Sequence, residues 1–342
     1  MVVKLGVIGT GAIGRDHMRR CHRVLAGARV VGVNDVDGAV ARSALASLDI
    51  DAQVFVSPHE LIASRDVDAI VVASWGTTHE EFVLAAIEAA KPVFCEKPLA
   101  VTAQGCRRVV DAEVARGRRL VQVGFMRPFD AGYIALKKTL DGNQIGTPLI
   151  AHCTHRNVSV PPGFSDAILV TEMLSHEVDV LRWLLNDEFV SAQVVFPRRT
   201  ANAPAPLRDP QVVLLKTAKG VRVDVELFAH ARYGYDIRCE IVGEFGVAEL
   251  PDPPSVLLRS EARRSNALLV DWKDRFVDAY DAELRAFIDQ AATGSASGPS
   301  AWDGYAAAMA CDAAIGSQAT LEITPIPVPL RPALYQTKRS EA

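Results

Sequence analysis

The chain has 342 residues, which is more than one hydrophobic core usually serves, so two domains are expected. Hydrophobic residues make up 49% of it and charged residues 23%, as in ordinary globular proteins. The net charge of −4 gives no overall positive field for nucleic acid, and no apolar run approaches the roughly 20 residues that span a bilayer. Neither nucleic acid nor a membrane is therefore expected as a partner.

The first third of the chain alternates short β-branched runs with helical stretches. Strands are expected at residues 4–9, 29–35, 54–56, 69–74, 92–96 and 120–124. Helices are expected at 11–25, 38–47, 58–64, 79–90 and 102–116. This alternation predicts an α/β domain over residues 1–123, with a parallel, doubly wound sheet.

Beyond residue 124 the pattern changes. Helices are expected at 130–143, 171–185, 271–292 and 302–317. Strands are expected at 149–157, 211–216, 220–228, 235–242 and 246–250. The sequence therefore predicts a second, α+β domain over residues 124–342 with a mostly antiparallel sheet. The end of the chain could pack back on the first domain.

A GxGxxG motif follows the first strand and opens the first helix, which is the context that dinucleotide binding requires. Its glycines allow a tight turn, a close approach of backbone N–H groups to a pyrophosphate, and close helix–strand packing. The anion would lie at the helix N-terminus, where free N–H groups favour negative charge. The expected cofactor contacts in this loop are Gly9, Thr10, Gly11, Ala12, Ile13 and Gly14.

Asp35 ends the second strand, where a carboxylate can accept hydrogen bonds from the adenosine ribose. It would repel the 2′-phosphate of NADP, and its neighbours Val36 and Asp37 offer no arginine to neutralise that phosphate. We therefore expect NAD as the cofactor, with Asp35 and Val36 among its contacts. The alternative is that Asp35 is only a polar strand end and that Asp37 or Arg15 matters more.

Two further strand ends carry candidate residues. Ser74, Trp75 and His79 follow an apolar strand, at the edge where doubly wound folds bind ligands. A buried loop aromatic is the alternative for Trp75. Glu96 and Lys97 end the next strand, where Lys97 could polarise a reacting hydroxyl and hold a developing alkoxide. The alternative there is an ordinary solvated turn.

The amphipathic segment 171–185 places Glu172, His176 and Asp179 at spacings that share one stripe of an α-helix. A carboxylate beside an imidazole raises its basicity, which suits His176 to removing a hydroxyl proton near neutral pH. A surface salt bridge is the alternative. No histidine in the chain shows a metal-ligand spacing such as HExxH, so no metal is expected.

The six cysteines are scattered without a CxxC pair, which favours free thiols in a reducing cytosol over a disulfide framework or a zinc site. The first residues also lack the charged start, apolar stretch and cleavage site of a signal peptide. A cytoplasmic protein is therefore expected.

Three of these motifs occur in the order found in one known family. Gly9–Gly14, Glu96-Lys97-Pro98 and the helix with His176 together resemble the Gfo/Idh/MocA oxidoreductases. Four longer stretches resemble the bacterial inositol dehydrogenases within that family: Gly124–Asp130, Tyr133–Lys138, Tyr233–Ile237 and Ser300–Tyr305. The resemblance runs from Lys4 to about Pro325.

The resemblance implies an N-terminal Rossmann domain and a C-terminal domain whose large open sheet pairs with a partner's sheet in dimers or tetramers. It also implies that Lys97 is the active-site lysine and His176 the general base, with Glu172 beside them. The expected substrate contacts are Lys97, Arg127, His155, Asn157, Glu172, His176 and Tyr235.

The implied reaction is NAD-dependent oxidation of a cyclic polyol hydroxyl to a ketone, with myo-inositol as the first substrate. Inositol dehydrogenases usually carry aspartate where this chain has Glu172, and often a basic residue where it has Pro128. Another inositol isomer such as scyllo-inositol, or an aldose, is therefore the alternative substrate. A regulatory protein that binds NAD without turnover is the alternative from another functional class.

Overall fold

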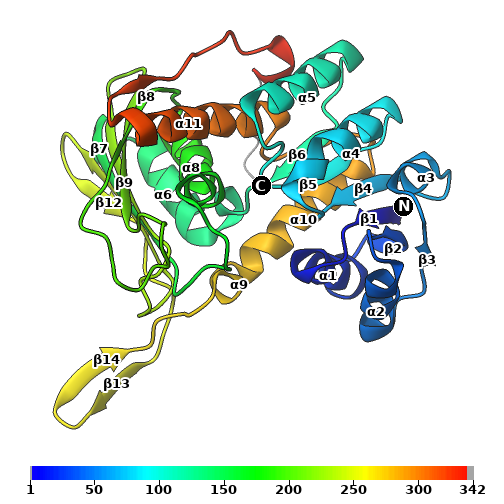
Figure 1. Ribbon diagram of the computed structural model, residues 1–342, viewed down its shortest axis with the longest axis horizontal. Coiled ribbons are helices and arrows are strands. Elements are labelled where there is room, and N and C mark those ends of the chain that lie inside the picture. The colour runs from blue at the N-terminus through cyan, green and yellow to red at the C-terminus, as the bar shows by residue number, and fades with distance from the viewer. Residues whose placement is uncertain (1, 337–342) are drawn as a thin grey trace. The chain divides into compact units, whose positions relative to one another are not determined.

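The computed structural model describes residues 2–336 (Figure 1). The chain divides into two compact units. Unit 1 contains the described residues up to Met126, then Tyr280–Ala308 and the described residues from Pro329 onward. Unit 2 contains Arg127–Ala279 and Met309–Val328. No helix in the described part of the chain is long and apolar enough to cross a membrane.

Unit 1 contains a six-stranded sheet in the order β3-β2-β1-β4-β5-β6, in which every pairing is parallel. The predicted doubly wound sheet is confirmed. Its strands are β1 (Val3–Ile8), β2 (Ala28–Asn34), β3 (Gln53–Val54), β4 (Ala69–Val72), β5 (Val93–Glu96) and β6 (Val121–Gly124). All residues of β4, β5 and β6 are buried, as expected for a parallel sheet covered on both faces.

The helices between these strands are α1 (Ala12–Arg19), α2 (Gly38–Leu48), α3 (Pro58–Ala63), α4 (Gly76–Glu88) and α5 (Ala103–Arg116). Side chains of Asp37, Ser57 and Thr102 accept backbone N–H groups at the starts of α2, α3 and α5. The helix expected over 11–25 is present over 12–24, but its last turn, Arg20–Val24, is π-helical. An apolar pattern cannot distinguish i→i+5 from i→i+4 hydrogen bonding.

Residues far along the chain complete the core of unit 1. Leu284 and Phe287 of α10 (Val277–Ala291) are fully buried in the same apolar cluster as Leu5, Val33 and Phe94. The single helix expected over 271–292 is wrong, because α9 (Trp272–Arg275) ends at Phe276 and α10 begins after it. The phenylalanine adopts φ of −119° and ψ of 24°, which no α-helix accommodates.

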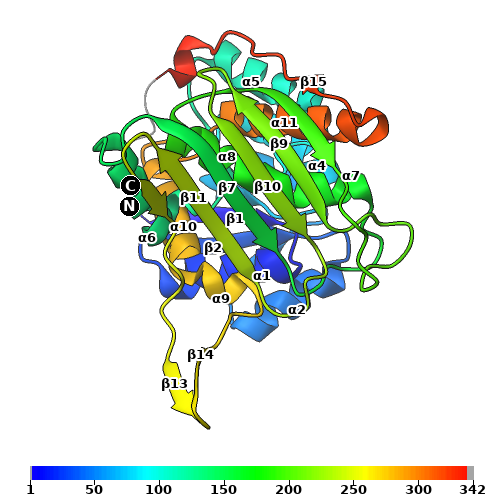
Figure 2. The same ribbon diagram turned by 90° about the vertical axis from the view of Figure 1, so that its left-hand side faces the viewer.

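Unit 2 contains a seven-stranded sheet in the order β12-β11-β7-β10-β9-β8-β15 (Figure 2). It is mostly antiparallel, as predicted, but β7 and β10 pair in parallel. Its strands are β7 (Pro148–Arg156), β8 (Phe189–Val195), β9 (Gln211–Thr217), β10 (Arg222–Phe228), β11 (Asp236–Gly243), β12 (Val247–Glu249) and β15 (Thr324–Pro325). Buried residues alternate with less buried ones along β9 and β10, so one face of the sheet is open.

The remaining short elements and helices are η2 (Arg127–Phe129), α6 (Ala131–Asp141), α7 (Asp166–Leu169), η3 (Val170–Leu174), α8 (Ser175–Leu185), α11 (Ala301–Thr320) and η4 (Ala333–Tyr335). The helix expected over 171–185 is present, but its first turn, η3, is π-helical rather than α-helical. A separate hairpin, β13 (Leu257–Ser260) and β14 (Arg263–Asn266), was not expected from the sequence, since its exposed strands have no apolar alternation.

A buried carboxylate ties three segments of unit 1 together. Glu113 of α5 is fully buried and accepts the Leu120 N–H at 2.5 Å and the Val121 N–H at 2.8 Å. Its other oxygen accepts the Tyr335 hydroxyl at 2.7 Å. Burial raises the pKa of Glu113. The hydroxyl of Tyr335 thus fastens the last described helical turn to the first unit.

We expect Tyr335→Phe to lower the free energy of unfolding by about 1–3 kcal/mol, because one Glu113 oxygen then has no donor inside the protein. Chemical denaturation followed by circular dichroism measures the loss. Tyr305→Phe is the control, since its hydroxyl bonds to Arg107, whose side chain is 43% exposed. Equal effects of the two variants would contradict this role of Tyr335.

Candidate active site

The GxGxxG loop has the geometry that a pyrophosphate needs. Gly9 adopts φ of +90°, and a Cβ added there would lie 2.5 Å from the Ser74 backbone nitrogen. A Cβ on Gly14 would lie 2.0 Å from the Gly9 carbonyl oxygen, so only glycine allows this helix–loop contact. A Cβ on Gly11 would meet nothing within 4 Å. Gly11 caps α1 without a side-chain hydrogen bond, so N–H groups and open space are available to an anion.

Asp35 is fastened to this loop. Its Oδ2 accepts both the backbone N–H and the hydroxyl of Thr10, each at 2.7 Å, and its Oδ1 accepts the Asp37 N–H at 3.2 Å. Partial burial would raise the pKa of Asp35, but the hydrogen bonds from Thr10 and from the Asp37 and Val36 backbone together outweigh it and the pKa is lowered. The carboxylate is therefore ionised and held at the end of β2, while the Val36 side chain beside it is 99% exposed. These residues fit the adenosine ribose of a dinucleotide.

The turns after β4 and β5 are linked by His79. Its side chain is 1% exposed, with Nδ1 2.7 Å from the Pro98 carbonyl oxygen and Nε2 3.1 Å from the Ser74 carbonyl oxygen. A direct cofactor contact by His79 stays a prediction, while the structure gives the residue a positioning role. Trp75 directly precedes α4 and is 81% exposed, so the alternative of a buried aromatic is wrong.

The turn with Glu96 and Lys97 is not an ordinary solvated turn. Glu96 is 8% exposed, and its Oε1 lies 2.7 Å from Nε2 of His17, a fully buried side chain of α1. The other carboxylate oxygen accepts the backbone N–H of Lys97 at 3.2 Å. Glu96 therefore fixes the backbone from which Lys97 projects. His17 is a supporting residue that the sequence reasoning missed, because no spacing connects positions 17 and 96.

In unit 2, His176 lies in the first turn of α8 and is 8% exposed, and Asp179 is fully buried. The alternative of a surface salt bridge is therefore wrong. Glu172 lies in the π-helical turn before α8, so the α-helical stripe expected for Glu172 and His176 does not apply to this pair. Only His176 and Asp179 keep α-helical spacing. The role of Glu172 stays a prediction.

The rings of His176 and Tyr235 both lie near the ring of His155. The His155 ring lies 6.3 Å from the His176 ring and 6.0 Å from the Tyr235 ring, measured between centroids. Burial raises the pKa of Tyr235 to about 12, so its hydroxyl stays protonated and can donate a hydrogen bond. Asn157 follows β7 directly, and its backbone pairs with Phe228 and Ala231. Together these side chains offer donors and acceptors suited to a polyhydroxylated ligand.

A buried ion pair supports this group. Nη1 of Arg127 lies 2.5 Å from Oε1 of Glu177, and Nδ1 of His155 lies 3.1 Å from the same oxygen. Arg127 and Glu177 are 1% and 0% exposed. Burial would raise the pKa of Glu177, but the charges and hydrogen bonds of Arg127 and His155 together outweigh it and the pKa is lowered. A substrate contact by Arg127 stays a prediction. In the structure its guanidinium forms an ion pair with Glu177.

Comparison with known proteins assigns the family. Residues 3–125 match the Gfo/Idh/MocA oxidoreductase family model for an NAD-binding Rossmann fold, and residues 137–328 match the family's C-terminal alpha/beta domain. The chain belongs to the Gfo/Idh/MocA oxidoreductase family. The predicted resemblance is confirmed. The glycine loop and Asp35 therefore lie in the domain that gives the family its dinucleotide-binding fold.

Several members of this family are similar to the chain over nearly its whole length. The inositol 2-dehydrogenases of Pseudomonas fluorescens (strain SBW25) and Azotobacter vinelandii are 60% and 59% identical over 98% of this chain and 100% and 99% of theirs. The crystal structure of myo-inositol dehydrogenase from Lactobacillus casei in complex with NAD(H) and myo-inositol is 42% identical. It covers 98% of this chain and 100% of its own, with a TM-score of 0.96.

Glu177 is a member of the site that the sequence reasoning did not select. It directly follows His176 in a helix whose next residues include Val178 and Val180. A carboxylate in such a buried run requires a cation, which was the available signal. Its partner, Arg127, lies 50 positions earlier in the chain, so the pairing could not be identified from one sequence.

We expect Glu177→Gln to lower the free energy of unfolding by about 3–5 kcal/mol, because it leaves the buried Arg127 guanidinium without its counter-charge. Adding Arg127→Met should recover most of the loss, since no buried charge then remains. Denaturant unfolding of the two variants and the wild type measures this. A double variant less stable than Glu177→Gln would show that the pair is not the source of the effect.

The same pair gives a pH dependence. The pKa of Glu177 is lower in the folded chain than its ordinary value of 4.5. Its contribution to stability is thus complete above that value and is lost as the pH falls through the lowered pKa. The stability difference between wild type and Glu177→Gln should be largest above about pH 4.5 and shrink as the pH falls below that value. A difference that grows on acidification would be the opposite sign.

Proposed function

We propose that this protein is an NAD-dependent dehydrogenase that oxidises one hydroxyl of a cyclic polyol to a ketone, with inositol 2-dehydrogenase activity on myo-inositol. The observation that carries the proposal is the 60% identity over 98% of the chain to an inositol 2-dehydrogenase. The solved relative with NAD(H) and myo-inositol supports both ligands. The rings of His155, His176 and Tyr235, held by buried supports, are chemically suited to a ligand rich in hydroxyl groups.

The protein's residues have distinct roles in this reaction. His176 removes the proton of the hydroxyl group as the hydride leaves the same carbon, and a C=O double bond forms. Lys97, with its positive charge, stabilises the negative charge that develops on the oxygen. When bound, NAD supplies the acceptor for the hydride. Lys97 belongs to unit 1 and His176 to unit 2.

Substrate positioning is assigned to Arg127, His155, Asn157, Glu172 and Tyr235. His155 and Tyr235 donate or accept hydrogen bonds to the other ring hydroxyls, while Arg127 and Glu177 fix the His155 ring. Glu172 has one methylene more than the aspartate expected at this position, and a misplacement of about 1 Å can lower a rate by on the order of 10²-fold. The choice among inositol isomers therefore depends on this residue.

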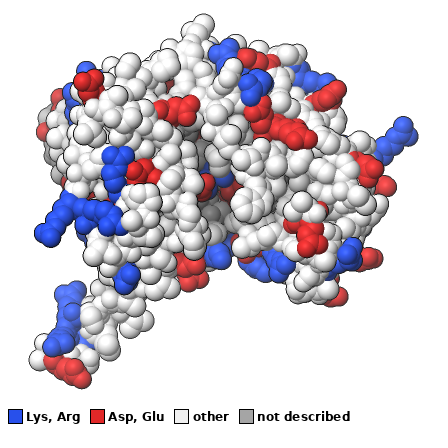
Figure 3. All heavy atoms as spheres, viewed as in Figure 1, with Lys and Arg blue, Asp and Glu red and all other residues white. Residues whose placement is uncertain are grey.

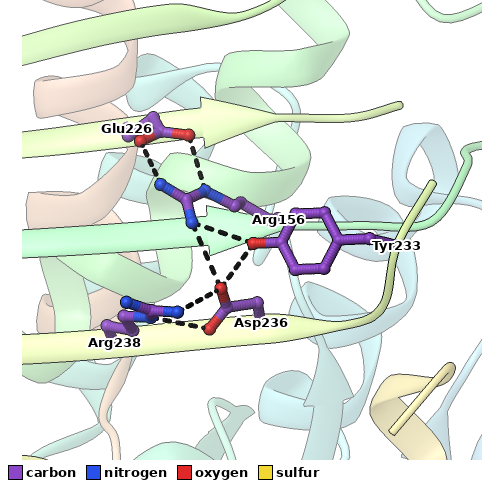
Figure 4. A network of polar contacts seen from close by, with 5 residues as sticks. All are labelled: Arg156, Glu226, Tyr233, Asp236 and Arg238. Carbon is purple, nitrogen blue, oxygen red and sulfur yellow. Dashed lines mark hydrogen bonds and ion pairs between the residues drawn. The ribbon is translucent and has the colours of Figure 1, made fainter. Parts of the chain in front are cut away.

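We further propose a cytoplasmic homo-oligomer, of tetrameric size, that associates through the open face of the seven-stranded sheet. All six cysteines are free and buried, which suits a reducing compartment. The open face carries a polar network in which Arg156 pairs with Glu226 and Asp236, and Tyr233 and Arg238 bond to Asp236 (Figure 4). Such paired charges can be covered by a second sheet without an unpaired buried charge.

We expect His176→Ala to lower kcat by on the order of 10²–10⁴-fold on the best substrate, because general-base catalysis is lost. NADH formation is measured with myo-inositol, scyllo-inositol and glucose for wild type, His176→Ala and Lys97→Met. His59→Ala is the control, since His59 is an exposed residue that pairs with exposed Glu81 and contacts the Phe82 ring. A His176→Ala enzyme with the wild-type rate would refute the base assignment. Tight NAD binding without turnover of any polyol would indicate a regulatory protein.

Cofactor choice gives a separate prediction. Asp35→Ser removes a charged acceptor of the ribose hydroxyls, so the KM for NAD should rise about 10- to 100-fold while NADP becomes a usable cofactor. Asp37→Ser is the matched control, because serine can still cap α2 as Asp37 does. Initial rates with both cofactors measure the effect. A larger rise in the KM for NAD in Asp37→Ser than in Asp35→Ser would show that Asp37, and not Asp35, contacts the ribose.

A further inference from the structure

Residues 251–270 leave unit 2 as an arm that ends in the hairpin of β13 and β14. The arm begins beyond Leu250, whose N–H bonds to the Cys239 carbonyl, and returns at Leu269, whose carbonyl accepts the Tyr235 N–H; both distances are 2.7 Å. Figures 1 and 2 show the hairpin projecting clear of the seven-stranded sheet. Every residue of its two strands is exposed. A two-stranded hairpin without further packing is marginally stable in water.

The surface of the arm is both basic and apolar. Arg259 lies directly opposite Arg264 across the hairpin, and Arg263 is next to it. Like charges at opposite positions destabilise a strand pair, and neither of the opposed arginines has an ion-pair partner among the described residues. Figure 3 shows blue Lys and Arg side chains gathered on the projecting arm, with red acidic side chains at its end. Val256 and Leu258 add side chains that are 83% and 55% exposed.

The edge of the sheet in the same unit has the opposite charge. Glu240 of β11 lies directly opposite Glu249 of β12, the last strand at that side of the sheet. The hydrogen bond with Glu240 and its negative charge raise the pKa of the Glu249 carboxyl. Phe245 and Val247 beside this pair are 83% and 53% exposed. An edge strand also presents unpaired backbone groups that can bind another segment.

We propose that the arm of one copy of this chain docks on the β11–β12 edge of a second copy, with the Arg259–Arg264 pair against the Glu240–Glu249 pair. Each pair of like charges then receives its counter-charge, and the exposed apolar side chains of both surfaces are covered. The hairpin projects away from its own sheet edge, so the edge that it meets belongs to another copy. A two-fold arrangement would let both arms dock at once. The inference rests on the proposed self-association.

Docking would also affect the site already described. The returning end of the arm accepts the backbone N–H of Tyr235, and Leu268 packs so close to Gly234 that a Cβ there would lie 3.0 Å from the Leu268 Cβ. An arm held by a second copy therefore fixes the segment that carries Tyr235. Loss of the docked arm should raise the KM for the polyol more than it lowers kcat.

Charge reversal tests the contact. Arg259→Glu/Arg264→Glu places like charges at the contact and should raise the dissociation constant of the oligomer, measured by sedimentation velocity, about 10-fold or more. Glu240→Arg/Glu249→Arg should have the same effect. All four changes in one chain should restore assembly to within about three-fold of wild type, because the charges are again complementary. Arg42→Glu/Arg65→Glu, at two exposed arginines of unit 1, is the matched control.

The outcomes are distinct. Unchanged assembly on reversal of the arm, or no rescue by the four-fold variant, overturns the arm contact while leaving self-association intact. A wild-type protein that sediments as a monomer at every concentration overturns self-association itself, and leaves the dehydrogenase activity to be judged by turnover. Far-ultraviolet circular dichroism of each variant excludes unfolding as the cause, and reversal at the control arginines should leave the mass unchanged.

Discussion

A charge that leaves water must find a partner inside the protein, and in both units of this chain one such carboxylate contacts residues of the candidate site. In unit 1 the carboxylate is Glu96, which bridges the His17 ring and the backbone of Lys97. In unit 2 it is Glu177, which lies between Arg127 and His155. Neither carboxylate needs to touch a substrate. Burial of each carboxylate costs free energy. In return, Glu96 holds the backbone of Lys97 and Glu177 holds the ring of His155.

The residues nearest the strand ends were predictable because their signals are local. Gly9, Gly11 and Gly14 follow a strand, and the turn geometry that the motif requires leaves no space for a Cβ at the first and third of them. Asp35 was found for the same reason, since it closes the second strand. What the sequence did not indicate was Thr10 as the double donor to Asp35, because this contact depends on how two loops approach each other.

The residues that could not be predicted are those joined over long sequence separations or by irregular backbone. Glu177 meets Arg127, and Glu113 meets Tyr335, through folding that no pattern in one sequence encodes. The π-helical turns at Arg20–Val24 and Val170–Leu174 follow apolar patterns that are equally compatible with an α-helix. The second turn ends directly before α8, where the backbone returns to α-helical spacing and His176 projects. Single π turns occur frequently at functional sites.

The same electrostatic rule links the interior to the surface. A buried charge without a partner costs several kcal/mol, so Glu177 and Arg127 are paired within the chain. An exposed pair of like charges costs far less, because water and salt screen it, and can persist in a single chain. The opposed arginines of the arm and the opposed glutamates of the sheet edge are of this second kind. The repulsion within each pair is tolerated in the free chain. On assembly it favours the correct partner, because an oppositely charged surface relieves the repulsion and a surface of the same sign increases it.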